Sequence, residues 1–262
     1  MLVAVLALLS ACSSNLEHST SAQSTAAAAG MVQREIPAGG FDLTAYVRIK
    51  DPGQPITVYI EGDGADWVSR SQPSMDPTPR HFTGLRLAVL DPSANAAYLA
   101  RPCQYSWGAA CNTTYWTDRR FSEEVIASMS AALDRLKTAG GIHLVGYSGG
   151  AAVAVLVAAR RNDVLSLRTV AGNLDSEAVN RFNRVSPMPA SLNPVDVAAH
   201  LAALPQRHLT GSADKRVPPF IAEGFVASLG SSRCATVTVV PGASHESGWE
   251  KVWPTAIPTC DN

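Results

Sequence analysis

Residues 141–160 read GIHLVGYSGGAAVAVLVAAR, with Ser148 between glycines. The stretch before it (141–147) is apolar and β-favouring, and the stretch after it (149–160) is apolar and rich in small residues, as in a buried helix. A serine needed only for solubility could lie in any loop, whereas a serine on a sharp turn between a strand and a helix is a candidate nucleophile. The stretch therefore predicts a strand, a tight turn that carries Ser148, and a buried helix.

The composition is that of a chain with one large core. The 262 residues are 46% hydrophobic and 16% charged, and the formal net charge is -1. Single α/β domains reach this length, so one folded domain is expected. A chain so close to neutral has no overall field that attracts a polyanion, and we expect no nucleic-acid partner.

The first twelve residues, MLVAVLALLSAC (1–12), form an apolar run that ends in small residues and a cysteine. The run is too short to span a bilayer, which takes about 20 residues, and it is typical of a signal peptide. Leu9 to Cys12 resembles the bacterial lipobox, in which the cysteine is lipidated and becomes the mature N-terminus, although no Lys or Arg precedes Arg34. We expect a bacterial cell-envelope protein anchored to the membrane through a lipid on Cys12. The alternative is a periplasmic or secreted protein without the lipid.

The next segment, SSNLEHSTSAQSTAAAAG (13–30), is rich in Ser, Thr and Ala and shows no apolar periodicity. It is predicted to be a flexible tether with an end-to-end distance of roughly 20–25 Å as a random coil. Residues 31–262 are expected to form the folded domain.

Four cysteines remain beyond Cys12, an even number in a chain with an export signal: Cys103, Cys111, Cys234 and Cys260. Four cysteines allow three connectivities. We favour the pairs close in sequence or able to tie the C-terminus to the last strand, which are 103 with 111 and 234 with 260. The alternative is four free thiols in a cytosolic protein. The chain has no CxxC and no Cys/His cluster with zinc spacing, so we expect no metal site.

Short β-favouring runs alternate with helical patterns along the rest of the chain. The expected strands lie at residues 41–49, 55–64, 85–90, 141–147, 165–173, 207–214 and 235–242. The expected helices lie at residues 122–140, 149–160, 193–204 and 217–230. This alternation predicts an α/β fold with a mainly parallel sheet covered on both faces. Residues 91–120 break the pattern as an aromatic-rich, irregular segment, and such long loops are usually functional or cross-linked.

The pentapeptide Gly146-Tyr147-Ser148-Gly149-Gly150 fits G-x-S-x-G, a pattern that is weak alone and stronger between a strand and a helix. With this motif in its context, the chain resembles the α/β-hydrolase family over residues 31–253. The resemblance implies a twisted, mainly parallel sheet of about eight strands, helices on both faces and a small lid, here expected at residues 174–205. It also implies a nucleophile, an acid and a histidine in that order along the chain.

Two further stretches match the family's acid and base. RHLTGSADKRVPP (207–219) places Asp214 after a strand, and VTVVPGASHESGW (237–249) places His245 after the last strand. A serine alone is a poor nucleophile, so His245 would accept the proton of Ser148 and return it to the leaving group. Asp214 would orient the imidazole and stabilise its charged form. The resemblance thus implies the catalytic residues Ser148, Asp214 and His245.

Each of these residues also has a plainer interpretation. Ser148 could be an ordinary helix N-cap, and Asp214 could cap the helix that begins near Val217. Asp175 is a second candidate for the acid, because some family members carry it after the preceding strand. The remaining histidines are expected to be structural or solvated: His18, His81, His143, His200 and His208.

The resemblance also implies an oxyanion hole. The backbone N–H of Gly149, at the start of a helix, is the expected first donor. The second is expected in VYIEGDGADW (58–67), from the N–H of Asp63 or else of Gly64. Glu61 stands where the family often has a histidine. Glu61, Asp63 and the nearby Asp66 could suggest a cation site, but acids in a glycine-rich turn are more often solvated.

A narrower resemblance is to uncharacterised bacterial exported α/β-hydrolases with R-P-C-Q and Y-W-T words, here residues 101–104 and 115–117. That group implies no substrate. Tyr147, Tyr115 and Trp116 are candidates to line a substrate pocket, because aromatic rings supply apolar surface with a polar tip. The aromatic residues of the loop could equally form a satellite core beneath the disulfide.

Together these patterns predict an exported serine hydrolase that cleaves a carboxylester or thioester through an acyl-enzyme, with no organic cofactor. The substrate would be a small or lipid-like ester. A peptidase or amidase would use the same residues and is one alternative. The other is a non-catalytic envelope binding module that has kept the fold.

Overall fold

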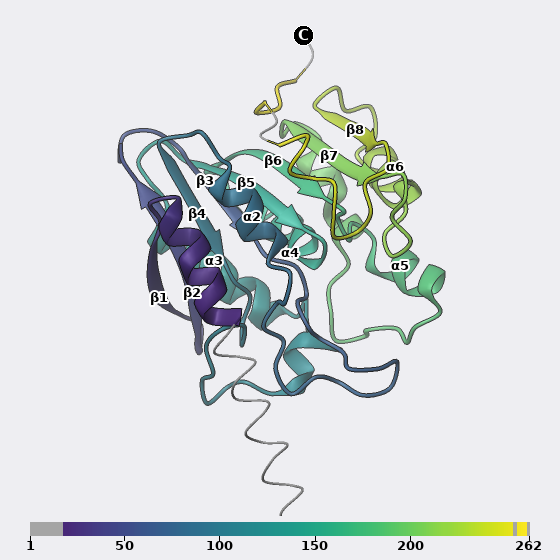
Figure 1. The fold of residues 1–262 in the computed structure, drawn as a ribbon. Coiled ribbons are helices and arrows are strands. Elements are labelled where there is room, and N and C mark those ends of the chain that lie inside the picture. Colours follow the sequence, from purple (N-terminus) through teal and green to yellow (C-terminus); the bar gives the residue numbers. More distant parts are fainter. Residues whose placement is uncertain (1–17, 254–255, 261–262) are drawn as a thin grey trace, which may run out of the picture.

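A computed structural model of the protein describes residues 18–253 and 256–260. An eight-stranded sheet with the order β1-β2-β4-β3-β5-β6-β7-β8 runs through its centre (Figure 1). The strands are β1 (Val32–Ala38), β2 (Phe41–Ile49), β3 (Ile56–Ile60), β4 (Asn95–Leu99), β5 (Ile142–Tyr147), β6 (Val164–Val170), β7 (Gln206–Gly211) and β8 (Ala235–Val240). The β1/β2 and β2/β4 pairs are antiparallel and the pairs from β4 to β8 are parallel. The fold is therefore the mixed, mostly parallel α/β sheet that the sequence predicts.

Helices lie on both faces of this sheet, because the strands alternate apolar side chains between the faces. Along β3, Ile56, Val58 and Ile60 enter one apolar cluster and Tyr59 enters the other. The α-helices are α2 (Thr83–Val89), α3 (Glu123–Leu136), α4 (Gly149–Ala158), α5 (Ser176–Asn183) and α6 (Pro219–Ser228), with 3-10 helices η1 (Thr113–Trp116) and η2 (Pro194–Leu201). Helices α3, α4 and α6 share the first cluster with η2, and α2 belongs to the second.

Helix α4 lies directly on the strands and is buried at every residue. Two glycines allow this close approach. A Cβ at Gly146 would lie 2.4 Å from the Cα of Ala151, and a Cβ at Gly150 would lie 2.3 Å from the carbonyl oxygen of Ile60. These glycines set the position of the turn between β5 and α4, which carries Ser148.

The prediction of a strand at residues 85–90 is wrong, since residues 85–89 lie in α2 and Leu90 is its C-cap. The run LRLAVL was ambiguous because alternating leucines fit a strand while Leu85 and Ala88 fit one face of a helix. Both of these residues are fully buried. A tertiary contact favours the helix over the strand. The carboxylate of Glu61 accepts a hydrogen bond from the N–H of Gly84 (3.2 Å) in the first turn of α2.

Two strands were missed. β1 pairs with β2 as an antiparallel hairpin, and β4 lies within the segment 91–120 that was expected to be irregular. The β4 sequence NAAYL is short and alanine-rich, with no alternation, because all five residues are buried between β2 and β3. From residue 101 to the start of α3 the segment is irregular apart from η1, as expected.

The expectation of a flexible tether is wrong for residues 18–30. Residues 18–28 form a helix, the purple helix of Figure 1, and Ala22 and Ala26 on it are fully buried. They lie one helical turn apart and join the apolar cluster that contains Tyr46 and Leu85. Alanine forms helices readily, but its small side chain gives only a weak apolar periodicity. The sequence pattern therefore does not show this helix. The proposed signal peptide and lipobox, with Cys12, lie outside the described residues.

Two disulfides join Cys103 to Cys111 and Cys234 to Cys260, so the favoured pairing is confirmed. The segment 174–205, expected to contain a lid, holds α5 and η2. η2 packs on α4 and α6 as part of the main body. Within the described residues, no helix combines the length and hydrophobicity needed to cross a membrane.

Candidate active site

Ser148 lies on a sharp turn between β5 and α4. Its backbone has φ 51° and ψ -120°, in the region where side chains rarely occur and strain is expected. Hydrogen bonds hold the turn: the Ser148 N–H donates to the Val170 carbonyl (2.9 Å), and the Ser148 carbonyl accepts from the N–H groups of Ala151 and Asn173 (3.0 Å each). The surrounding backbone therefore fixes the hydroxyl at the carboxyl edge of the sheet, where α/β proteins bind ligands.

The structure brings Ser148, His245 and Asp214 together in one line of hydrogen bonds. The Oγ of Ser148 lies 2.9 Å from Nε2 of His245, and Nδ1 of His245 lies 2.9 Å from Oδ2 of Asp214. The three residues follow β5, β8 and β7, three strands that end at the same edge of the sheet. The imidazole can accept the serine proton at Nε2 while its other nitrogen donates to the carboxylate.

The carboxylate of Asp214 is held from its other side by the backbone. Its Oδ1 accepts the N–H groups of Arg216 (2.8 Å) and Val217 (2.9 Å). Burial alone raises the pKa of Asp214, but the hydrogen bond and charge of His245 and these two amides outweigh burial, so the pKa lies below the ordinary value of an aspartate. An ionised Asp214 is the form that stabilises a positively charged imidazole.

Asp175, the second candidate for the acid, has a different task. Its Oδ1 accepts the N–H of Ala178 (3.0 Å) as the N-cap of α5 and also the side-chain amide of Asn193 (3.0 Å). Two other histidines lie inside strands: His208 pairs with Thr169 and His143 with Ser166. Burial lowers the pKa of His208 to about 3, which keeps that ring neutral.

The loop after β3 passes directly over the serine. A Cβ at Gly62 would lie 3.2 Å from the Cβ of Ser148 and 3.0 Å from the ring of Tyr147. The Asp63 side chain packs on the first residue of α4, where a Cβ at Gly149 would lie 2.1 Å from Oδ1 of Asp63. The two residues whose amides are the expected oxyanion donors, Asp63 and Gly149, are thus in contact beside Ser148. Gly64 turns the loop away, with φ 72°.

A group of buried charges behind this loop was not anticipated from the sequence. The Asp63 carboxylate receives Arg101 on one oxygen and Arg120 on the other (2.8 Å), and Arg120 also pairs with Asp66 (3.0 Å). Burial alone raises the pKa of Asp63, but the charges of Arg120 and Arg101 outweigh it, so the pKa lies below the ordinary value. The R-P-C-Q word and an excess of acids in residues 61–66 were the only sequence signals of this pairing.

The expectation that Glu61 is solvated is wrong, because its side chain is buried beneath the loop. Its Oε1 accepts the N–H of Gly62 (2.9 Å) and of Gly84 (3.2 Å), which ties the loop to α2. Burial raises the pKa of Glu61 to about 7, although the amides of Gly62, Gly84 and Leu85 lower it. No cluster of three or more His, Cys, Asp or Glu side chains in the described part of the chain is arranged to hold a metal ion.

The three aromatic candidates for a substrate pocket have contacts of their own. The hydroxyl of Tyr147 donates to the carbonyl oxygen of His245 (3.1 Å), so this ring lies beside the histidine. Tyr115 packs edge-on against Phe41, and buried Trp116 donates its indole N–H to the Ser74 carbonyl (3.0 Å). Tyr147 therefore supports the site directly, whereas Tyr115 contacts Phe41 and Trp116 packs edge-on against Trp107 of the disulfide loop.

Solved structures share this architecture. Est1E from Butyrivibrio proteoclasticus has a TM-score of 0.56 at 14% identity, over 81% of this chain and 90% of Est1E. Lip1 from Acinetobacter baumannii AYE has a TM-score of 0.62 at 13% identity, over 87% of this chain and 89% of Lip1. A puromycin-hydrolysing peptidase from Mycobacterium tuberculosis has a TM-score of 0.59 at 16% identity, over 82% of this chain and 36% of the peptidase.

No protein-family model matches the chain, and no curated protein matches it by sequence. At identities this low, structural similarity shows the fold alone. The protein therefore has the α/β-hydrolase fold, with a serine, a histidine and an aspartate assembled at the carboxyl edge of its sheet.

Proposed function

We propose that this protein is a serine hydrolase that cleaves a carboxylester or thioester through a covalent acyl-enzyme. The observation that carries the proposal is the line of hydrogen bonds from Ser148 through His245 to Asp214, built on a strained turn beside two backbone amides. A serine that merely capped α4 would need neither the histidine nor the buried carboxylate.

The reaction follows from this geometry. As Oγ of Ser148 attacks the carbonyl carbon, its proton passes to Nε2 of His245, and the oxyanion is stabilised by the N–H groups of Gly149 and Asp63. When the carbon–oxygen or carbon–sulfur bond breaks, His245 protonates the leaving alcohol or thiol. A water molecule then gives a proton to His245 and attacks the acyl-enzyme, which releases the acid and restores the hydroxyl of Ser148.

Labelling with a fluorophosphonate probe tests the nucleophile. We expect the wild type to be labelled and Ser148→Ala not to be labelled, while Ser228→Ala, at the end of α6, is labelled as the wild type is. A correctly folded wild type that resists the probe would overturn the serine-hydrolase proposal and favour a non-catalytic binding module.

The class of substrate is tested by comparing leaving groups. p-Nitrophenyl esters of increasing acyl length, an acyl thioester and aminoacyl p-nitroanilides present the same site with oxygen, sulfur and nitrogen leaving groups. We expect turnover of the esters or the thioester to exceed that of the anilides. Preferential cleavage of the anilides would reassign the protein as a peptidase or amidase.

We also propose that the protein is exported and anchored by a lipid on Cys12. The apolar run and lipobox-like residues 1–12 support this, and so do the two disulfides, since disulfides persist mainly in oxidising compartments. In a bacterial host, radiolabelled palmitate should enter the wild type but not Cys12→Ser. Equal labelling of the two would reject the anchor.

A further inference from the structure

The peptide bond between Gly62 and Asp63 joins the proposed active site to the R-P-C-Q segment behind it. In a planar trans peptide, the carbonyl oxygen of one residue and the N–H of the next point in opposite directions. Whatever binds the carbonyl of Gly62 therefore also sets the direction of the N–H of Asp63. That N–H is the second oxyanion donor of the proposed function, on which this inference rests.

The carbonyl of Gly62 is bound by Gln104. Its Nε2 donates to that oxygen at 3.0 Å, and its Oε1 accepts the N–H of Arg101 at 3.0 Å. Because a backbone N–H can only donate, the oxygen of the amide must face Arg101 and the nitrogen must face Gly62. Gln104 is 1% exposed, so water does not compete for either bond.

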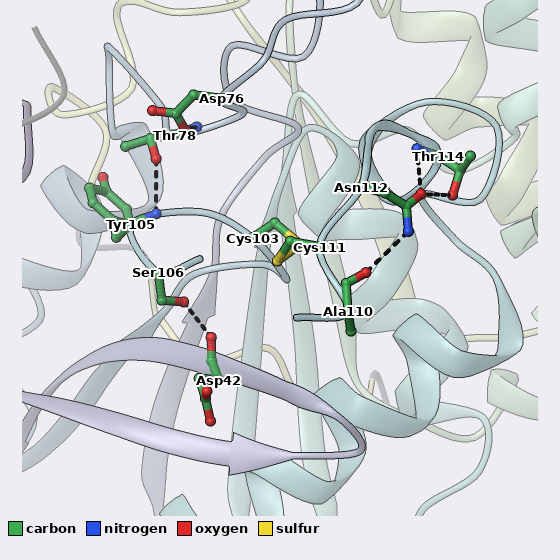
Figure 2. Close-up of a disulfide and its surroundings, with 10 residues drawn as sticks. All are labelled: Asp42, Asp76, Thr78, Cys103, Tyr105, Ser106, Ala110, Cys111, Asn112 and Thr114. Atoms are coloured by element: carbon green, nitrogen blue, oxygen red, sulfur yellow. Dashed lines mark hydrogen bonds between the residues drawn. A yellow bond between two sulfur atoms is a disulfide. The ribbon is translucent and has the colours of Figure 1, made fainter. Parts of the chain in front are cut away.

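The backbone around Gln104 is held in an unfavourable conformation. Its two neighbours, Cys103 (φ 69°) and Tyr105 (φ 62°), both adopt the left-handed region that side chains usually avoid. Such conformations persist where the surroundings enforce them. Here the disulfide from Cys103 to Cys111 holds one side, and the N–H of Tyr105 donates to Oγ1 of Thr78 (2.9 Å) on the other (Figure 2).

The same segment also holds the side chain of Asp63. Arg101, 3% exposed, pairs with the carboxylate that packs on Gly149, and Arg120 pairs with its other oxygen. The two guanidinium groups compensate a negative charge that would otherwise oppose an oxyanion forming nearby. Gln104 therefore fixes the peptide plane, and the arginines fix the side chain of the same residue.

We infer that Gln104 is a positioning residue for catalysis, which, through the carbonyl of Gly62, holds the N–H of Asp63 toward the oxyanion. The disulfide-bonded R-P-C-Q segment is then the support of the oxyanion loop. This assigns a function to the R-P-C-Q motif, which takes no part in the Ser148, His245 and Asp214 triad. Its effect belongs to the transition state, where the oxyanion is fully formed, more than to substrate binding.

The test compares two buried glutamines that make the same kind of bond. Gln206, also 1% exposed, donates from Nε2 to the Leu201 carbonyl (2.7 Å) at the start of β7, the opposite end of that strand from the turn leading to Asp214. On the preferred ester, we expect Gln104→Met to lower kcat on the order of 10- to 100-fold with KM within about threefold, since loss of a whole oxyanion donor costs about 100- to 1000-fold. Gln206→Met should lose a similar amount of thermal stability and keep the wild-type kcat.

A second variant separates positioning from packing. Gln104→Glu keeps the shape and the acceptor for Arg101 but places a carboxylate oxygen against the Gly62 carbonyl. Protonation of this carboxyl restores an O–H donor, so its kcat relative to wild type at the same pH should rise as the pH falls. Equal kcat for wild type and a folded Gln104→Met overturns the inference while leaving the serine hydrolase intact. The inference is also overturned if the kcat of Gln104→Glu relative to wild type does not change with pH. Failure of both variants to fold overturns it as well, because the bond of Gln104 to Gly62 would then be needed for folding. An inactive wild type that resists the fluorophosphonate instead rejects the proposed function.

Discussion

Ser148 combines a reactive position with an unfavourable backbone. Residues in sparsely populated backbone regions cost on the order of 1–3 kcal/mol, and the φ of 51° at this serine belongs to that class. A glycine adopts such a conformation without a Cβ clash. A glycine at position 148 would therefore relieve this strain, but it would remove the nucleophile.

Replacement of Ser148 tests this strain directly. Ser148→Gly should raise the free energy of unfolding by about 1 kcal/mol, because the relief of strain exceeds the added entropy of a glycine in the unfolded chain. Ser148→Ala, which keeps the Cβ, is the matched control and should not be stabilised. Urea unfolding of both variants measures the difference. Equal stability of the two would mean that the turn is not strained.

Glu61 predicts a dependence of stability on pH. Its pKa rises from an ordinary 4.5 to about 7 in the folded protein, so the folded state retains a proton that the unfolded state has lost between these values. The free energy of unfolding should therefore fall as the pH rises from about 5 to 8, by about 3 kcal/mol at most. Glu61→Gln, which carries no titrating proton, should remove that part of the slope in urea titrations.

The control for this titration is Glu223→Gln, an exposed position on α6. It should keep the wild-type slope. If Glu61→Gln and Glu223→Gln have the same pH dependence as wild type, Glu61 is ionised throughout and the backbone amides around it outweigh the effect of burial.

The residues of the site differ in how far sequence could predict them. Ser148, Asp214 and His245 each follow a strand in a family order, and local motifs were enough to place them side by side. Gln104 and Arg101 could not be assigned, because their partners lie about forty residues away across a loop whose path no periodicity encodes.

At the level of elements, the N-terminal helix is an integral part of the packing. Ala22 and Ala26 are fully buried, whereas Ala27, the next residue of the same helix, is exposed. Ala26→Glu should bury an unpaired carboxylate and destabilise the protein by several kcal/mol. Ala27→Glu, the same change on the outer face, should be nearly neutral. Thermal unfolding distinguishes them, and equal melting temperatures would show that this helix is not docked.

Most elements followed from alternation and caps, and two of the errors share one physical origin. Residues 85–90 and β4 are short and mostly apolar, so their local pattern fits helix and strand alike. What decides between them is tertiary: the Glu61 carboxylate at the first turn of α2, and the pairing of β4 between β2 and β3. Longer elements such as α3 carry enough period to be predicted alone.

At the scale of the whole molecule, the disulfide from Cys234 to Cys260 ties the C-terminal segment to the start of the edge strand β8. It closes 26 residues of sequence separation, and the chain-entropy model gives about 3 to 4 kcal/mol for such a loop. The double variant Cys234→Ala/Cys260→Ala, which leaves neither partner as a lone thiol, should lose about this much stability in urea while keeping the proposed esterase activity. A loss of activity with unchanged stability would contradict this.

The docked N-terminal helix also limits how far the folded body could lie from the lipid proposed on Cys12. Only residues 13–17 separate Cys12 from the first described helical residue, and five residues span roughly 16–18 Å even when fully stretched. A lipid on Cys12 would then hold the folded body of the protein close to the headgroups of the membrane. The proposed active site could then not contact polymers far from the membrane. It would be accessible to small esters and to lipids at the bilayer surface.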